Sequence, residues 1–227
     1  MSLRLDYCSY EAAKFAVEHW HYSKTMPCGK LVKIGVWENN KYIGCILYSG
    51  GAVNIARGEG YGMKKMNDIV ELSRVALCKH QVPVSKILSI SIKMLKKQSP
   101  NLKMIISFSD ELDQGHLGII YQAMNFIYTG TFRGSGGFII KGKKYHNRSV
   151  YSKGWVQSEK WLRNNIDINA KKIKTIKHRY LYPLSKQVRN KILPLSKPYP
   201  KRLTSKDSVA ADNQSVEGGA SPTVRLL

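Results

Sequence analysis

The chain has 227 residues, of which 43% are hydrophobic, so it can bury the core of a globular protein without help from disulfides or a metal. It carries 37 Lys and Arg residues against 15 Asp and Glu residues, which gives a formal net charge of +22. So large an excess favours a polyanionic partner, most often nucleic acid, over a protein that is merely basic and soluble.

The cysteines and the apolar runs exclude other classes of protein. Cys8, Cys28, Cys45 and Cys78 form no Cys-x-x-Cys pair, so no zinc ribbon is expected. No signal peptide opens the chain, and no apolar run reaches membrane-spanning length. We therefore expect an intracellular protein with reduced thiols and no membrane partner.

The hydrophobic pattern predicts strands that alternate with helices up to about residue 150. In chain order these are a strand over 3–9, a helix over 10–22, a hairpin over 33–51, a loop over 52–67, a strand over 68–78, a helix over 83–100, a strand over 102–110, a short helix over 115–125, and two strands over 126–132 and 136–145. The hairpin turns at Asn39-Asn40, because Asn tolerates the positive φ of tight turns. This order indicates an α/β or α+β protein with a mixed sheet flanked by helices.

The last third of the chain has a different character. The segment "WVQSEKWLRNNI" (155–166) predicts a further helix, and residues 171–206 hold twelve Lys and Arg residues with no Asp or Glu. We expect a catalytic domain over 1–150, a basic extension over 151–206 that packs on it and contacts DNA, and a disordered tail over 207–227. The expected phosphate contacts are Lys171, Lys172, Lys174, Lys177, Arg179, Arg189 and Lys191.

Two short segments are candidates for chemistry. The segment "EHWHYSKTMP" (18–27) places polar aromatic side chains at the end of the first helix. The segment "KHQVPVSK" (79–86) places backbone N–H groups at a helix start, beside Lys79, His80 and Lys86, where an anion could bind. It lacks the glycines of a Walker or Rossmann loop, and in isolation an ordinary strand–helix connection accounts for it better.

A resemblance gives these segments a meaning. The strand over 68–78, the segment 79–86 and the helix over 83–100 are followed by "GIIYQAMNFIYTGTF" (118–132). Together these segments resemble the acyl-CoA-binding half of the GNAT acyltransferase superfamily. With "HWHYSK", "ELSRVAL", "ISFSD" and "RYLYPL" added, the series from about residue 10 to 203 resembles the Mom family of phage proteins. Mom proteins convert adenine in DNA to an N6-carbamoylmethyl derivative, which shields phage DNA from restriction enzymes.

The resemblance implies roles for individual residues. It places Arg74, Val75, Ala76 and Leu77 on the strand that binds the acyl donor, and Ser85 and Lys86 at its phosphate. It implies acetyl-CoA or another acyl donor as cofactor, double-stranded DNA as partner, and the cytoplasm of the bacterial host as location. The loop departs from the GNAT pattern, since Gln81 is followed by Val82-Pro83 and no glycine. A backbone without glycine cannot approach a pyrophosphate as closely.

The implied catalytic residues are His21, Tyr22, Asp110 and Tyr121. Adenine N6 is a poor nucleophile, so an enzyme must orient the base and take its proton. Asp110 or His21 could accept that proton, and Tyr22 or Tyr121 could stabilise negative charge or protonate a leaving group. The segment 18–27 would then form the wall that meets a base flipped out of the duplex.

Structural roles and other functions stay open at this point. A histidine at a helix end often caps the helix, Tyr121 could be core, and Asp110 could cap the following helix. No ligand spacing supports a metal site. The alternative functions are an acetyl-CoA-dependent N-acetyltransferase that acts on RNA or protein, and a non-catalytic DNA-binding protein on a GNAT scaffold.

Overall fold

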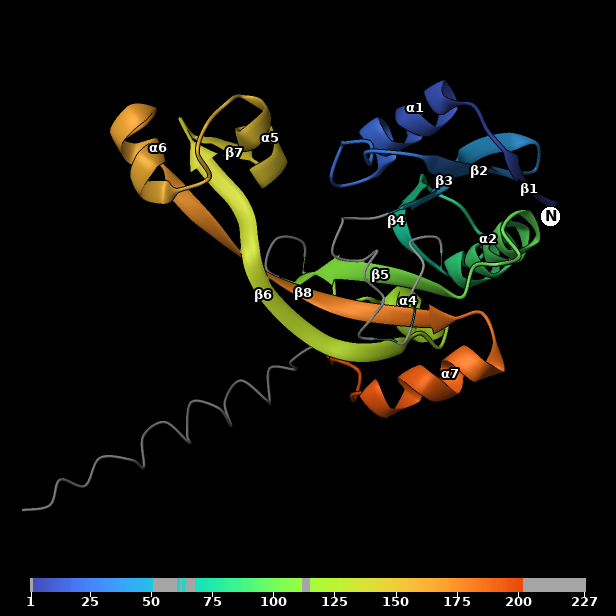
Figure 1. Ribbon diagram of the computed structural model, residues 1–227. Helices are drawn as coiled ribbons and strands as arrows, with labels where there is room; N and C mark the ends of the chain where they lie inside the picture. Colours follow the sequence, from blue (N-terminus) through green and yellow to red (C-terminus); the bar gives the residue numbers. More distant parts are fainter. Residues whose placement is uncertain (1, 51–60, 62, 64–67, 112–114, 202–227) are drawn as a thin grey trace, which may run out of the picture.

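The computed structural model describes residues 2–50, 61, 63, 68–111 and 115–201. Its centre is an eight-stranded mixed sheet with the strand order β1-β2-β3-β4-β5-β8-β6-β7 (Figure 1). The strands are β1 (Leu3–Tyr7), β2 (Leu31–Glu38), β3 (Lys41–Ser49), β4 (Ile69–Leu77), β5 (Met104–Asp110), β6 (Ile127–Ile140), β7 (Lys143–Tyr145) and β8 (Lys171–Pro183).

Helices cover both faces of this sheet, so the predicted α/β class with a mixed sheet is confirmed. One face packs against α2 (Val84–Gln98) and α4 (Ile119–Ala123), and the other against α1 (Tyr10–Trp20) and α7 (Lys186–Ile192). The remaining helices are α5 (Asn147–Ser152), α6 (Glu159–Asn165) and a 3₁₀ turn, Leu193–Leu195. None of the helices that the structure describes is long and apolar enough to cross a membrane.

The predicted elements up to β5 lie where the pattern placed them. The turn between β2 and β3 has Asn39 at φ 49° and Asn40 at φ 63°, the two positive values that a type I′ turn requires. Ser9 caps α1 by accepting the N–H of Ala12. The predicted loop over 52–67 and the tail over 207–227 lie almost wholly outside the described residues.

A separation of two strands creates the space for a site. Strands β4 and β5 are the parallel pair in the described sheet, and they pair only from Ile69 to Glu71 opposite Met104–Ile106. Beyond Glu71 and Ile106, β4 and β5 no longer pair with each other. Ser73 is an extra residue in β4, since Leu47 pairs with Arg74 and Tyr48 with Leu72, and such a bulge bends the strand.

The carboxyl-terminal third differs from its prediction. Residues 171–183 form β8, which lies inside the sheet between β5 and β6, so this segment is not an extension packed on a finished domain. Two strands were expected over 126–132 and 136–145, but β6 is one long strand followed by the short β7. Its register shifts near Gly130 and Gly137, which have φ of 98° and 118°, let it bend without breaking.

The first half of β8 pairs with β6 alone and leaves the main sheet. Pairing with β5 ends where Lys177 meets Asp110, whereas pairing with β6 continues to Lys171. This two-stranded ribbon ends in a tip made of β7, α5 and α6, which packs on its own cluster around Phe138, Val150 and Leu162. We call residues 131–177 the arm; Figure 1 shows it leaving the sheet and carrying the tip at its end.

Candidate functional site

A cavity of about 270 Å³ lies beside the separated ends of β4 and β5. Its walls come from the end of α1, the second half of β4, the loop before α2 with the start of that helix, β5, and α4 with the segment that leads into it. The lining residues are Trp20, His21, Tyr22, Ser73, Val75, Leu77, His80, Val84, Phe108, His116, Ile120 and Tyr121. Among the described residues no Asp or Glu lines the cavity, so its chemistry depends on histidines and hydroxyl groups.

His21 is buried and presents a hydrogen-bond donor. The backbone N–H of Ser23 donates to its Nδ1 at 3.1 Å, so in the neutral ring the hydrogen sits on Nε2. Burial, together with the charge of Arg74, lowers the pKa of His21 to about 3. The ring is therefore neutral at physiological pH, and its low pKa makes it a weaker proton acceptor than an ordinary histidine.

His116, which precedes α4, presents the same tautomer in the same cavity. The backbone N–H of Gly118 donates to its Nδ1 at 3.0 Å, which again leaves the hydrogen on Nε2. Burial and the nearby His178 lower the pKa of His116. Two neutral Nε2–H groups are thus available to a ligand that brings a carbonyl oxygen or a ring nitrogen into the cavity.

His80 has the reverse arrangement. Its Nδ1 lies 2.7 Å from the carbonyl oxygen of Cys78, and because a carbonyl only accepts, the hydrogen sits on Nδ1. The Nε2 of a neutral His80 therefore carries a lone pair. The sequence placed His80 only beside an anion-binding loop, whereas the structure adds it to the lining of the cavity.

The two predicted tyrosines line the same cavity. Tyr121 is 6% exposed, and burial raises its pKa, so its hydroxyl stays protonated and can donate a hydrogen bond toward developing negative charge. Its ring lies 6.0 Å from that of His116 and nearly parallel to it. Tyr22 is half exposed, and its ring lies 4.2 Å from that of His21 at the mouth of the cavity.

Asp110 does not line this cavity. It lies at the end of β5, two residues beyond Phe108, where its Oδ2 accepts the hydroxyl of Thr175 at 2.8 Å. The carboxylate therefore ties β5 to the base of the arm.

The predicted donor-binding residues of β4 divide between its two faces. Val75 and Leu77 line the cavity, whereas Ala76 packs under α1. Arg74 donates from Nε and Nη2 to the carbonyl oxygen of Thr25, at 3.1 and 3.0 Å. It therefore fixes the segment that follows α1, and with it the wall that carries His21.

The expected phosphate loop already holds an anion. Both carboxylate oxygens of Glu38, at the end of β2, accept the N–H of Gln81, at 3.1 and 3.2 Å, and one accepts that of Val82 at 2.8 Å. A CoA pyrophosphate does not fit these two N–H groups while Glu38 occupies them. Ser85 and Lys86 lie on the first turn of α2, outside the cavity lining.

The predicted DNA contacts lie at two opposite ends of β8. Lys171, Lys172, Lys174 and Lys177 belong to the arm, whereas Arg189 and Lys191 belong to α7. Arg179 lies between them and donates to the Thr129 hydroxyl at 2.7 Å, while its guanidinium lies 5.4 Å from the ring centre of Tyr61.

Comparisons with known proteins give one family and a set of distant folds. No curated protein matches the chain. A putative phosphinothricin N-acetyltransferase matches with a TM-score of 0.48 and 11% identity, over 82% of this chain and all of the other. An N-acetyltransferase from Staphylococcus aureus Mu50 matches with a TM-score of 0.46 and 10% identity, over 82% of this chain and all of the other. A probable GNAT-family acetyltransferase from Chromobacterium violaceum ATCC 12472 matches with a TM-score of 0.45 and 8% identity, over 81% of this chain and 83% of the other.

The family assignment comes from the sequence itself. The model of the Mom protein family matches residues 2–201, which run from β1 through the cavity and the arm to the end of the described chain. Because this match spans the sheet and every wall of the cavity, the chain belongs to the Mom protein family.

Proposed function

We propose that this protein is a Mom-type transferase that modifies adenine N6 in double-stranded DNA to the carbamoylmethyl derivative and so protects the DNA from restriction. The observation that carries the proposal is the pairing of opposite histidine tautomers in one small aromatic cavity. His21 and His116 present hydrogens, and His80 presents a lone pair. A reaction that removes one proton from an amine while negative charge develops elsewhere needs both kinds of group.

The size and lining of the cavity suit a flipped base. Ligand pockets for drug-sized molecules start at roughly 300 Å³, so about 270 Å³ suits a single base better than a whole nucleotide cofactor. Trp20 and Tyr22 supply aromatic faces that offset the loss of stacking when the base leaves the duplex.

The chain's own groups then have distinct roles. As N6 forms its new bond to the methylene carbon of the donor, the bond from that carbon to the leaving group breaks, and the leaving group departs with the electron pair. N6 gives up one proton, and Nε2 of His80 accepts it. The Nε2–H groups of His21 and His116 and the hydroxyl of Tyr121 donate to the oxygen on which negative charge develops. The donor must therefore carry a preformed –CH2–CONH2 group on a leaving group, whereas acetyl transfer from acetyl-CoA would give an N6-acetyl amide and belongs to the alternative N-acetyltransferase reaction. Because the loop at Gln81 and Val82 does not fit the CoA pyrophosphate, no step is assigned to CoA.

Nucleoside analysis tests the proposal. Plasmid DNA from bacteria that express the protein, or carry an empty vector, is digested and the nucleosides are compared by mass. We expect deoxyadenosine to gain a carbamoylmethyl group in expressing cells. Unchanged deoxyadenosine with good expression would refute the proposal, and acetylated RNA or protein in the same cells would favour an N-acetyltransferase instead.

A matched pair of variants tests the role of His80. His80→Gln should lower the modified fraction by about 100-fold, in the range that general bases contribute. His19→Gln replaces a histidine that is exposed on α1 and stacks on Phe15, outside the cavity. Equal activity of the two variants would show that His80 does not accept the proton.

A further inference from the structure

The arm and the cavity lie at the same end of the sheet. The arm begins where Lys177 of β8 pairs with Asp110, the last residue of β5, and the cavity opens beside this end of β5. The other end of β8 pairs Pro183 with Met104, the first residue of β5. Helix α7 follows Pro183. Its cations therefore lie beyond the far end of β5, about 20 Å from the start of the arm at a rise of roughly 3.3 Å per residue.

The arm carries a large excess of positive charge, and its two carboxylates are engaged in hydrogen bonds within the arm. Residues 131–177 hold twelve Lys and Arg residues against two acids, Glu159 and Asp167. Glu159 pairs with Arg163 at 2.8 Å and accepts the backbone N–H of Lys172 at 2.8 Å. Asp167 accepts the backbone N–H groups of Lys141 and Asn169, which lower its pKa. Both carboxylates therefore hold the arm together, and the positive charge dominates its outer surface.

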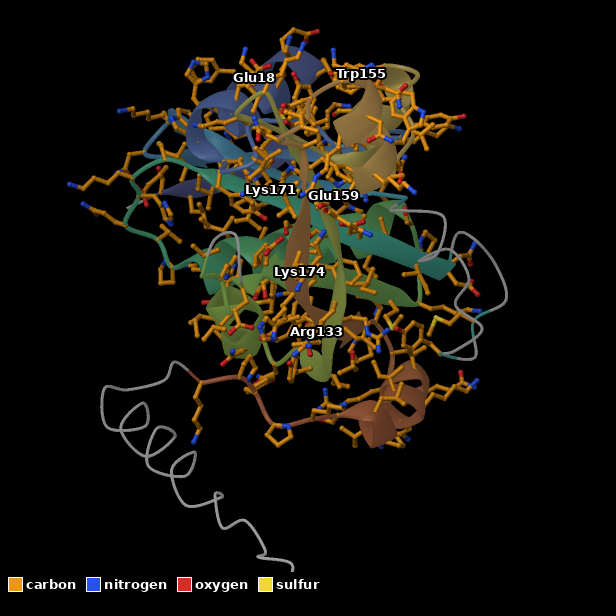
Figure 2. All side chains as sticks on the ribbon, turned by 90° about the vertical axis from the view of Figure 1, so that its left-hand side faces the viewer. Glu18, Arg133, Trp155, Glu159, Lys171 and Lys174 are labelled. Carbon is orange, nitrogen blue, oxygen red and sulfur yellow. The ribbon has the colours of Figure 1, made fainter. Side chains whose placement is uncertain are left out.

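The outer surface of the arm suits a duplex. Figure 2 shows Lys171 and Lys174 of β8 and Arg133 of β6 placed along the ribbon, and all three are exposed. At the tip, Tyr151 is 76% exposed, and the amine of Lys153 lies 5.8 Å from the ring centre of Tyr145. A two-stranded ribbon is narrow enough to follow a DNA groove, and exposed cations along it can contact the phosphates.

We propose that the arm is the surface that holds duplex DNA by its phosphates while the cavity receives the base, and that α7 takes no part. This inference rests on the proposed DNA partner, but it assigns the binding to residues 131–177 and includes the tip, where the sequence named no individual phosphate contact. Phosphate contacts carry no sequence information, so the arm holds all duplexes alike and selectivity comes from the cavity.

Two variants with the same reduction in charge test the inference. The arm variant is Lys143→Gln, Lys144→Gln and Lys174→Gln, and the control in α7 is Lys186→Gln, Arg189→Gln and Lys191→Gln; all six side chains are exposed. Affinity for a short unmodified duplex is measured by fluorescence anisotropy over a salt series, without any donor. Circular dichroism and melting curves confirm that both variants fold.

The arm variant should bind about 10- to 100-fold more weakly at 0.15 M salt, and its plot of log affinity against log salt should be shallower by about 0.9 for each phosphate that is no longer bound. The α7 variant should keep the wild-type slope. A slope that changes equally in both variants, or only in the α7 variant, would overturn the inference. Because binding is measured on unmodified DNA, the result is independent of whether adenine is the target.

Discussion

The neutral state of His21 predicts how the stability of the protein depends on pH. The folded pKa of His21 is about 3, whereas an unfolded histidine has a pKa of about 6.5. As pH falls below 6.5, His21 becomes protonated in the unfolded chain but stays neutral in the folded protein, so the free energy of unfolding decreases. Integrated from pH 7 to pH 5, this linkage removes about 2 kcal/mol of the free energy of unfolding.

The variant His21→Asn isolates this effect. Its side-chain oxygen can still accept the N–H of Ser23, which Nδ1 accepts in the wild type. Urea unfolding at pH 8, 7, 6 and 5 measures both proteins, and the pH 8 difference gives the cost of the substitution itself. Between pH 7 and 5 the variant should lose about 2 kcal/mol less than the wild type. Equal losses would show that His21 is not held neutral by burial, and the donor role assigned to it would fall with that result.

Three further substitutions test other parts of the structure. Glu38→Ala leaves two backbone N–H groups without their acceptor, so it should cost about 1–3 kcal/mol in urea unfolding; a neutral result would mean the carboxylate does not hold the loop. Gly44→Ala should cost at least about 2 kcal/mol, because its Cβ would meet the carbonyl oxygen of Ala76 at 2.0 Å, whereas Gly50→Ala meets nothing and should be silent in the same assay. Tyr121→Phe removes one buried hydroxyl and should lower adenine modification by about 10- to 100-fold with DNA affinity unchanged; full modification in the nucleoside assay would contradict its role.

Local patterns in the sequence predict the first two thirds of the fold well. The Asn39-Asn40 turn and the helix that Ser9 caps depend on neighbouring residues, so their chemistry is visible in the sequence. Strand β8 was missed because lysines occupy so many of its positions that charge obscures the alternation of Ile173, Thr175 and the residues beyond. Its place in the sheet depends on pairing with β5, far away in the chain.

The candidate site was likewise predicted in part. The resemblance brought His21, Tyr22 and Tyr121 together correctly, since all three line one cavity. It could not give the histidine tautomers, because these depend on which backbone group each Nδ1 meets after folding. Nor could it show that Glu38, 43 residues before Gln81, fills the expected phosphate loop.

The position of β8 also determines when the molecule can form during its synthesis. Strands β5 and β6 are made before β8, yet they are not neighbours in the finished sheet, and β8 fills the space between them. Met104 must wait for Pro183 to emerge from the ribosome, and until then both strands expose unpaired backbone groups along one edge. A chain truncated before residue 171 would therefore be an aggregation-prone fragment with two open edges, and not a smaller protein that folds without its basic segment.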